Sequence, residues 1–374
     1  MCGWRTNWTN PESASAFASD RSIDQQTHLT QPIGQARSIA MVVGIGIVGA
    51  GFMGNTHANA YHLIPSSKVV AVADIEPDRA SDFAEKHGAR PYSSLKSMLK
   101  DPDVQVVDIT LPTYLHSGAA VQAAEAGKHV ICEKPMALSL AEADRMIRAA
   151  RKSRVELMVA HVIRFWPEWA FLAEKAKRKE FGKIKAIRCL RLSSEPQWTW
   201  KRWTRDVRKA GGATVDLHIH DTDFITHVLG RPKAVMSIGW IDHIQTTYDY
   251  GKGAVALAIG GWFPLQGYPF LMSYECFLEN ATLTYYSDRK PTLTVYQRNK
   301  DPYNPDLASA GTESGVTAGN ISELGGYYEE LKYFVGCLEK GEKPNRIRPE
   351  EARQSLEICL AEVKSMKTGK KVNL

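Results

Sequence analysis

The chain has 374 residues, of which 44% are hydrophobic and 24% are charged. This length and composition exclude a disordered chain, a collagen-like repeat and a small disulfide scaffold, and they indicate two or three domains. The formal net charge of +6 is small, and the densest basic run, 175–179, accompanies no groove-reading motif, so we expect no nucleic-acid partner. The longest apolar stretches, 41–50 and 253–263, are too short to span a bilayer, so we expect no membrane partner.

The first 40 residues differ in composition from the rest of the chain. They are rich in Ser, Thr, Asn and Gln, and they show neither an apolar period nor the hydrophobic region of a secretion signal. We therefore expect residues 1–40 to be an extension, largely disordered or lying on the surface, with an arm that orders on a partner subunit as the alternative. The six cysteines show no CxxC spacing, which favours reduced thiols and a cytoplasmic protein.

From Met41 onward, apolar runs typical of buried strands alternate with helical segments. Helices are indicated by apolar residues at three- and four-residue spacing that end at glycines, such as Gly88 and Gly127. Strands buried on both faces and joined by helices predict a doubly wound parallel sheet, over residues 41–160. The expected strands are Met41–Val48, Lys68–Ala73, Val104–Ile109, His129–Cys132 and Val155–Ala160.

The first strand runs directly into a glycine-rich turn, GAGFMG. Its three glycines allow a tight turn, a close approach of backbone amides to a pyrophosphate, and close packing of the following helix. Asp74 follows about 20 residues later at the tip of the second strand, where a carboxylate can accept hydrogen bonds from ribose hydroxyls. Asp74 would repel a 2′-phosphate, which favours NAD, whereas Arg79 keeps NADP possible. The expected cofactor-binding residues here are Gly49, Gly51, Phe52, Met53, Gly54 and Asp74.

Three further stretches carry a family resemblance: LPTYLH at 111–116, AGKHVICEKP at 126–135, and GGATVDLHIHDTD at 211–223. With these motifs the chain resembles the glucose–fructose oxidoreductase/inositol dehydrogenase/MocA (Gfo/Idh/MocA) family from about Met41 to its C-terminus. The resemblance implies a Rossmann domain followed by an α/β domain, residues 161–374, built on a large, mostly antiparallel open sheet. It also implies a homodimer or homotetramer formed through that sheet.

The resemblance implies hydride transfer between NAD(P) and a hydroxyl-bearing carbon of a sugar, anhydrosugar or cyclitol. By motif position, Lys134 is the lysine of EKP, and Asp216 and His220 belong to the motif of the second domain. Thr113 and His218 depart from the residues that are common in the family, which bears on the substrate more than on the reaction class. The resemblance adds Pro112, Thr113, His116, Glu133 and Lys134 as cofactor-binding residues, and Lys134, Asp216 and His220 as substrate-binding residues. Side-chain chemistry adds two substrate-binding residues, Arg164 just past the last strand of the first domain and Trp203.

The chemistry of the three catalytic candidates supports these roles. A histidine with a pKa near neutrality suits the acceptance of the hydroxyl proton, and a lysine ammonium can polarise and position the substrate oxygen. Two glycines, Gly211 and Gly212, precede a predicted helix that ends at Gly230. On this helix Asp216 and His220 are i,i+4 neighbours that can point into one cleft, with Asp223 one turn further on. We therefore expect His220 as proton acceptor, Lys134 as polariser and Asp216 as the residue that orients substrate hydroxyls.

Other interpretations stay open at this stage. The cluster of His218, His220, Asp221, Asp223 and His227 is rich in metal ligands, but the two histidines of an HxH pair diverge by about 200° on a helix, so we expect no metal. The aromatic segment with Trp198, Trp200 and Trp203 could stack on sugar rings or be core. The same fold could also serve an NAD-dependent glycosidase that uses transient oxidation, or a non-enzymatic NAD-binding regulator.

Beyond residue 160, several strand-like runs alternate polar and apolar side chains, as in an antiparallel sheet with one covered face. Pro302–Asn320 reads as a polar loop, and two amphipathic helices, Gly325–Lys340 and Pro349–Lys367, close the chain. The expected strands are Ile184–Leu192, Ala234–Ile241, Ala254–Phe263, Phe270–Leu278, Ala281–Tyr286 and Thr292–Tyr296.

Overall fold

The computed structural model describes residues 42–265, 267–307 and 324–374. The extension expected over residues 1–40, the start at Met41 and most of the polar loop expected over 302–320 lie outside the described residues. Within the described part, no helix is both long and apolar enough to cross a membrane. The cysteines described, Cys132, Cys189, Cys276, Cys337 and Cys359, are all free thiols and are buried.

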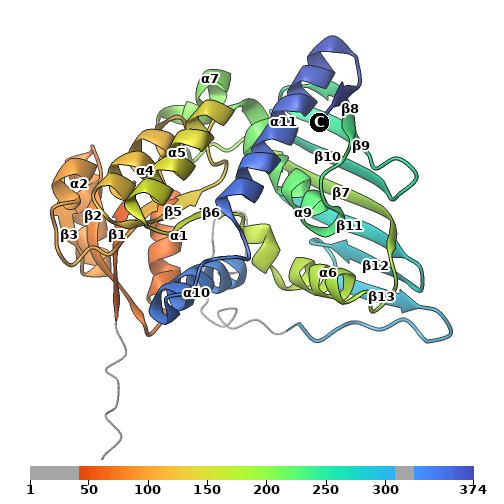
Figure 1. Ribbon diagram of the computed structural model, residues 1–374, viewed down its shortest axis with the longest axis horizontal. Helices are drawn as coiled ribbons and strands as arrows, with labels where there is room; N and C mark the ends of the chain where they lie inside the picture. Colours follow the sequence, from red (N-terminus) through yellow and green to blue (C-terminus); the bar gives the residue numbers. More distant parts are fainter. Residues whose placement is uncertain (1–41, 266, 308–323) are drawn as a thin grey trace, which may run out of the picture. The chain divides into compact units, whose positions relative to one another are not determined.

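The first sheet consists of parallel strands joined by helices (Figure 1), in the order β3-β2-β1-β4-β5-β6. The chain reverses its direction of winding between β1 and β4, which is the doubly wound arrangement predicted from the sequence. The edge strand β3 escaped prediction because it is short, polar and exposed. The strands are β1 Val43–Val48, β2 Ser67–Ala73, β3 Arg90–Tyr92, β4 Val106–Ile109, β5 His129–Glu133 and β6 Leu157–Ala160.

Helices cover both faces of this sheet, and their ends follow local rules. Helix α5 begins after Ser139, whose hydroxyl accepts from the amide of Glu142 and donates to the carboxylate of Glu142, so this capping pair is reciprocal. Helix α2 ends at Gly88, which has a left-handed φ of 67°. The helices are α1 Phe52–Tyr61, α2 Pro77–His87, α3 Leu95–Met98, η1 Thr113–Leu115, α4 His116–Glu125 and α5 Leu140–Ser153.

The second sheet has eight strands in the order β13-β12-β11-β7-β10-β9-β8-β14. Only β7 and β10 pair in parallel, so the sheet is mostly antiparallel and open, as expected. Since β6 ends at Ala160, we propose the domain boundary directly after this residue. The strands are β7 Ile184–Ser194, β8 Ala234–Trp240, β9 His243–Asp249, β10 Val255–Phe263, β11 Leu271–Leu278, β12 Ala281–Tyr286, β13 Leu293–Gln297 and β14 Val372–Asn373.

One face of the second sheet is covered by α9 Ile219–Leu229 and by α11 Pro349–Thr368 (Figure 1). Helix α11 also packs on α5 and β6, and Arg353 of α11 pairs with Asp144 of α5 at 2.6 Å, so the C-terminal helix packs back on the first half of the chain. Helix α10, Gly325–Lys340, packs on α1. The remaining helical segments are η2 Val162–Phe165, α6 Pro167–Arg178, η3 Trp200–Arg205, α7 Val207–Ala210 and α8 Gly212–Asp216.

The expectation of a single helix between Gly212 and Gly230 is wrong, because the helix is interrupted at Leu217–His218 between α8 and α9. The amide of His218 donates to the carbonyl five residues back, and the amide of His220 to the carbonyl three residues back. The His218 ring packs where a Cβ on Gly260 would lie, and its Nε2 is 3.3 Å from Glu362 of α11. Long-range packing of His218 therefore accompanies the local change in hydrogen bonding.

Candidate active site

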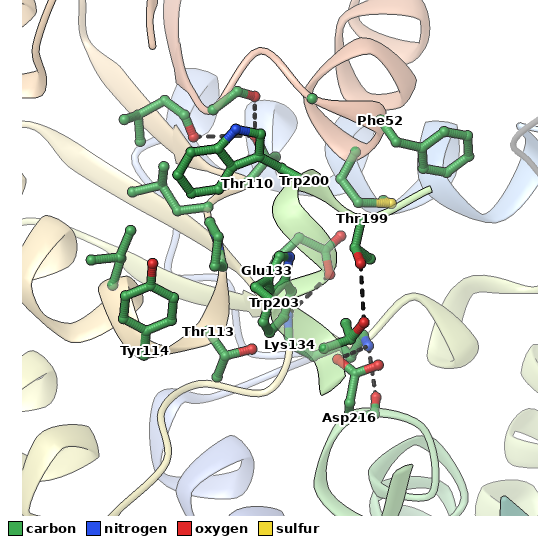
Figure 2. A pocket seen from close by; sticks show the side chains of 18 of the residues that line it. Phe52, Thr110, Thr113, Tyr114, Glu133, Lys134, Thr199, Trp200, Trp203 and Asp216 are labelled. Atoms are coloured by element: carbon green, nitrogen blue, oxygen red, sulfur yellow. Dashed lines mark hydrogen bonds and ion pairs between the residues drawn. The ribbon is translucent and has the colours of Figure 1, made fainter. Parts of the chain in front are cut away.

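A cavity of about 710 Å³ lies at the carboxyl ends of β1, β2, β4 and β5. Its wall combines residues of the first sheet with residues that follow β7 and with α8 and α9, so both halves of the chain form it (Figure 2). Ligands bind outside the carboxyl ends of the strands in doubly wound sheets, and this cavity has that position.

The glycine-rich turn forms one end of the cavity. Gly49 has a left-handed φ of 106°, and a Cβ on Gly54 would lie 2.1 Å from the carbonyl oxygen of Gly49, so both positions require glycine. No atom lies within 4 Å of a Cβ built on Gly51, which leaves the backbone at Gly51 open to the cavity. Phe52 and Met53 line the wall, whereas Gly54 acts through close packing behind it. This cradle and the size of the cavity fit a dinucleotide.

Asp74 lies beside the turn, at the tip of β2, and is already hydrogen-bonded. Its Oδ2 accepts from the amide of Ala50 at 2.9 Å, and its Oδ1 accepts from the amide of Glu76 at 2.9 Å and from Arg79 Nη2 at 2.6 Å. A carboxylate has about four acceptor positions, so one remains for a ribose hydroxyl. The sequence placed Asp74 correctly at the cavity but did not reveal that Arg79 partly neutralises its charge.

The catalytic candidates lie at the other end of the cavity. Lys134 Nζ donates to the carbonyl oxygen of Asp216 at 2.7 Å and to its Oδ1 at 3.3 Å (Figure 2). His220 lines the same wall and is 8% exposed, and its Nδ1 has no hydrogen-bond partner among the described residues. Burial, together with the positive charges of Lys134 and Arg191, holds the pKa of His220 well below its usual value. The imidazole is therefore neutral near pH 7 and can accept a proton.

A buried charged cluster lies behind this end and was not predicted from the sequence. His57 of α1 lies between Asp108 of β4, at 2.8 Å, and Glu133 of β5, at 3.1 Å. Burial alone would lower the pKa of His57, but these two carboxylates raise it well above its usual value. Glu330 of α10 is fully buried nearby, and neither of its carboxyl oxygens has a hydrogen-bond partner in the described part of the chain. Glu133 also lines the cavity, so the cluster reaches the site.

Several expected site residues lie elsewhere. His116 bonds the carbonyl oxygens of Leu111 and Pro135, and it does not line the cavity, although its neighbours Pro112 and Thr113 do. Arg164 is 2% exposed and pairs with Asp223 at 2.8 Å and with Glu351 at 2.7 Å, away from the cavity. The structure therefore gives Arg164 and Asp223 a buried structural contact rather than a contact with substrate.

Three tryptophans that follow β7 line the cavity: Trp198, Trp200 and Trp203. In the close view, Trp200 and Phe52 lie on the side away from Asp216 (Figure 2). The sequence alone left open whether these tryptophans stack on a ligand or belong to the core, and the structure places them on the cavity wall.

The ligand-rich cluster considered for a metal is dispersed. Among residues 42–265, 267–307 and 324–374, no group of three or more His, Cys, Asp or Glu side chains is arranged to hold a metal ion. Asp221 pairs with Arg191 at 2.9 Å, and Asp223 pairs with Arg164, so both carboxylates have basic partners.

Comparisons with known proteins agree with this geometry. A family model described as an oxidoreductase family with an NAD-binding Rossmann fold matches residues 43–161, and a model of the Gfo/Idh/MocA C-terminal domain matches residues 142–273. Trans-1,2-dihydrobenzene-1,2-diol dehydrogenase of Bos taurus is 32% identical over 340 residues, which cover 87% of this chain and 96% of that protein. Myo-inositol 2-dehydrogenase of Thermotoga maritima is 26% identical over 88% of this chain and 98% of its own length.

A solved structure of levoglucosan dehydrogenase, in complex with NADH and levoglucosan, has the same fold. Its TM-score is 0.78 at 23% identity, and the match covers 88% of this chain and 99% of that one. The family and fold class predicted from the motifs are thereby confirmed. The chain belongs to the Gfo/Idh/MocA family, and it is an NAD(P)-dependent oxidoreductase.

Proposed function

We propose that this oxidoreductase transfers hydride between NAD(P) and a hydroxyl-bearing carbon of a sugar, anhydrosugar or cyclitol. The observation that carries the proposal is the pairing of Lys134 with Asp216 on the wall that His220 also lines, in the cavity that the glycine-rich turn opens. The nicotinamide of the bound dinucleotide supplies the hydride acceptor or donor. The protein's own side chains position the hydroxyl and handle its proton.

Each catalytic residue has one role in alcohol oxidation. Two of the three ammonium donors of Lys134 are used by Asp216, which leaves one donor for the substrate oxygen. Asp216 fixes the ammonium and presents a carboxylate oxygen to neighbouring hydroxyls of a polyol. His220, kept neutral by burial and by Lys134, accepts the proton that the hydroxyl loses, and it returns this proton in the reverse reaction.

The substrate class is supported by chemistry and by relatives. Trp203 and Trp262 line the cavity, and aromatic faces stack on the C–H faces of sugar rings. Two relatives are named for myo-inositol and levoglucosan, both polyhydroxylated rings.

The test is reduced-nicotinamide absorbance with NAD and, separately, with NADP, each offered with inositols, aldoses, anhydrosugars and sugar acids. A rise with one ring class and NAD is expected. If no substrate gives a rise although NADH binds, the proposed reaction is wrong. Release of sugar from a glycoside with no net NADH would instead favour a glycosidase that uses transient oxidation.

We further propose a cytoplasmic homodimer or homotetramer formed through the second sheet. The face of this sheet that α9 and α11 leave uncovered exposes large apolar side chains, including Ile238 at 59% and Trp240 at 58%. Isolated monomers rarely expose large contiguous apolar patches. Sedimentation velocity should give an oligomer for the full chain and a shift toward monomer for Ile238→Lys; a monomeric wild type would contradict the assembly.

A further inference from the structure

The segment between β7 and α7 crosses the dinucleotide side of the cavity, and the reaction proposed above gives no role to its centre. We call residues 196–204 the tryptophan segment. A hydrogen bond holds residues 199–204 of it together, because the buried hydroxyls of Thr199 and Thr204 lie 3.0 Å apart. The residues of the tryptophan segment that line the cavity are Pro196, Trp198, Thr199, Trp200, Trp203 and Thr204.

The tryptophan segment contacts the first half of the chain at two places. The ring of Trp198 packs on Phe52 of the glycine-rich turn, with a centroid distance of 4.6 Å. Trp200 Nε1 donates to Glu76 Oε1 at 3.2 Å, and Lys201 Nζ donates to the same oxygen at 3.3 Å. Glu76 follows Asp74 by two positions, so the second contact lies at the ribose end of the dinucleotide site rather than at the catalytic end.

The electrostatics favour Trp200 in this position. Lys201 Nζ lies 4.4 Å and Arg79 Cζ lies 5.4 Å from the centroid of the Trp200 ring, so two cations face its π-system. Arg79 is the side chain that holds Asp74. The indole is therefore linked through Arg79 to the carboxylate that is expected to bind the ribose.

The backbone of the tryptophan segment is unusual where it makes this contact. Lys201 and Arg202 are consecutive non-glycine residues in the left-handed region, with φ of 49° and 50°. Such conformations are uncommon and tend to occur at ligand clamps, where the surrounding contacts hold them in place. Here the bond from the amide of Arg202 to the carbonyl oxygen of Thr199, at 2.9 Å, closes the turn.

We propose that Trp200 and Lys201 are cofactor-binding residues, and that the tryptophan segment is a clamp that holds the adenosine half of the dinucleotide. The hydrogen bonds to Glu76 keep this clamp closed. The proposal rests on the cofactor site of the proposed function and is independent of the substrate. The ligand group that Trp200 recognises is an adenosine diphosphate moiety, because an indole face stacks on a base. Ile75 also lines the cavity beside Asp74, and its side chain, which is 69% exposed, offers an apolar surface to the same base.

The experiment measures NADH dissociation by stopped-flow displacement and the Kd of ADP-ribose, which lacks nicotinamide, by calorimetry. Trp200→Ala should raise both the NADH dissociation rate and the ADP-ribose Kd by about tenfold, the loss expected from one base–aromatic stack. Glu76→Gln keeps the side-chain volume and weakens only the interactions of residue 76 with Trp200 and Lys201. It should therefore raise the NADH dissociation rate by a smaller factor. Tyr303→Ala is the matched control, because Tyr303 is an exposed aromatic side chain that does not line the cavity, and its loss should leave both quantities unchanged.

Two results would overturn the clamp. Unchanged dissociation rate and Kd in Trp200→Ala would show that Trp200 does not touch the cofactor. A faster association with a lower Kd would show that Trp200 blocks the adenosine site instead of clamping its occupant. If Trp200→Ala does not fold, Glu76→Gln alone decides, and an unchanged NADH dissociation rate rejects the clamp. Both measurements omit substrate, so a failed substrate screen would leave their outcome intact.

Discussion

The adenosine end and the catalytic end of the cavity are built in different ways. At the adenosine end, the glycine-rich turn follows β1, Asp74 follows β2 and Arg79 lies in α2, so all three come from adjacent elements close in the chain. Asp74 accepts from the amide of Ala50 in the turn and from Arg79. At the catalytic end, Lys134 and Asp216 are 82 positions apart and meet because the second half of the chain packs against the end of β5. The glycine-rich turn and Asp74 thus depend on a local motif, and the tryptophan segment of the second half only adds contacts to them. The pairing of Lys134 with Asp216, in contrast, exists only through packing between the two halves.

This comparison implies different responses to substitution. A change at the adenosine end should alter the affinity or the choice of dinucleotide and leave the chemical step in place. A change at the catalytic end should stop the chemical step and leave dinucleotide binding measurable.

Lys134→Met should have the largest effect. It removes the ammonium that we propose polarises the substrate oxygen, and we expect kcat to fall by about a thousandfold or more while NADH binding remains measurable by fluorescence titration. Lys152→Met, at an exposed position of α5, is the control and should behave as wild type. A kcat for Lys134→Met within tenfold of wild type would reject the catalytic assignment.

His220→Gln should follow, with a fall in kcat/KM of about a hundredfold, since general-base catalysis contributes about 10²–10⁴. Because burial and Lys134 hold the pKa of His220 well below 6.5, wild-type kcat/KM should stay level as the pH falls to 6.5 and decrease only below it, where His220 protonates. The variant should lose this acid limb. His129→Gln, at the amino end of β5, is the control and should keep the decrease of kcat/KM at low pH. If His220→Gln also keeps this decrease, a group other than His220 causes it.

Asp74→Ser should have a smaller effect, confined to the choice of cofactor. Loss of a charged acceptor for the ribose should lower kcat/KM with NAD by about tenfold. The same change releases Arg79 Nη2, now bonded to Asp74, to bind a 2′-phosphate, so kcat/KM with NADP should rise. Asp78→Ser, at an exposed position in the first turn of α2, is the control. An unchanged NAD-to-NADP ratio would show that Asp74 does not select the cofactor.

The same contrast explains what could be predicted from the sequence. The parallel sheet and the glycine-rich turn follow from apolar runs and from glycines whose neighbours lie close in the chain, and both are found as expected. Lys134, Asp216 and His220 were carried over from the family resemblance, and the cavity brings them together.

The remaining features depend on long-range contacts that leave no periodic trace in the sequence. Arg164 lies in η2, four residues after β6 ends, and has the charge of a substrate ligand, but its ion pairs with Asp223 and Glu351 hold it in a buried position away from the cavity. The interruption between α8 and α9 accompanies the contact of His218 with Glu362, which lies in the C-terminal helix. His57 is one of several polar residues in the sequence of α1, and only the structure shows the two carboxylates on either side of it.

The smallest effect concerns stability, and it arises from Glu330 behind the catalytic end. Burial, and then the negative charges of Glu133 and Asp108, raise the pKa of Glu330 well above 4.5, so the folded protein keeps this carboxyl protonated where the unfolded chain ionises it. The contribution of Glu330 to stability is therefore full below pH 4.5 and is lost as the pH rises through the folded-state pKa. Glu330→Gln cannot ionise and should escape this loss.

The Tm of Glu330→Gln relative to wild type should consequently increase between pH 5 and pH 8, by about 1.5 °C for each kcal/mol recovered. Glu329→Gln, on the same helix but partly exposed, should show no such trend. A Tm difference that does not change with pH would contradict this prediction. It would mean that a charged partner keeps the Glu330 carboxyl ionised in the folded protein. A rising difference would show that the buried Glu330, which has no hydrogen-bond partner among the described residues, lowers the stability of the folded protein. The buried Asp74 at the adenosine end differs, because it accepts three hydrogen bonds.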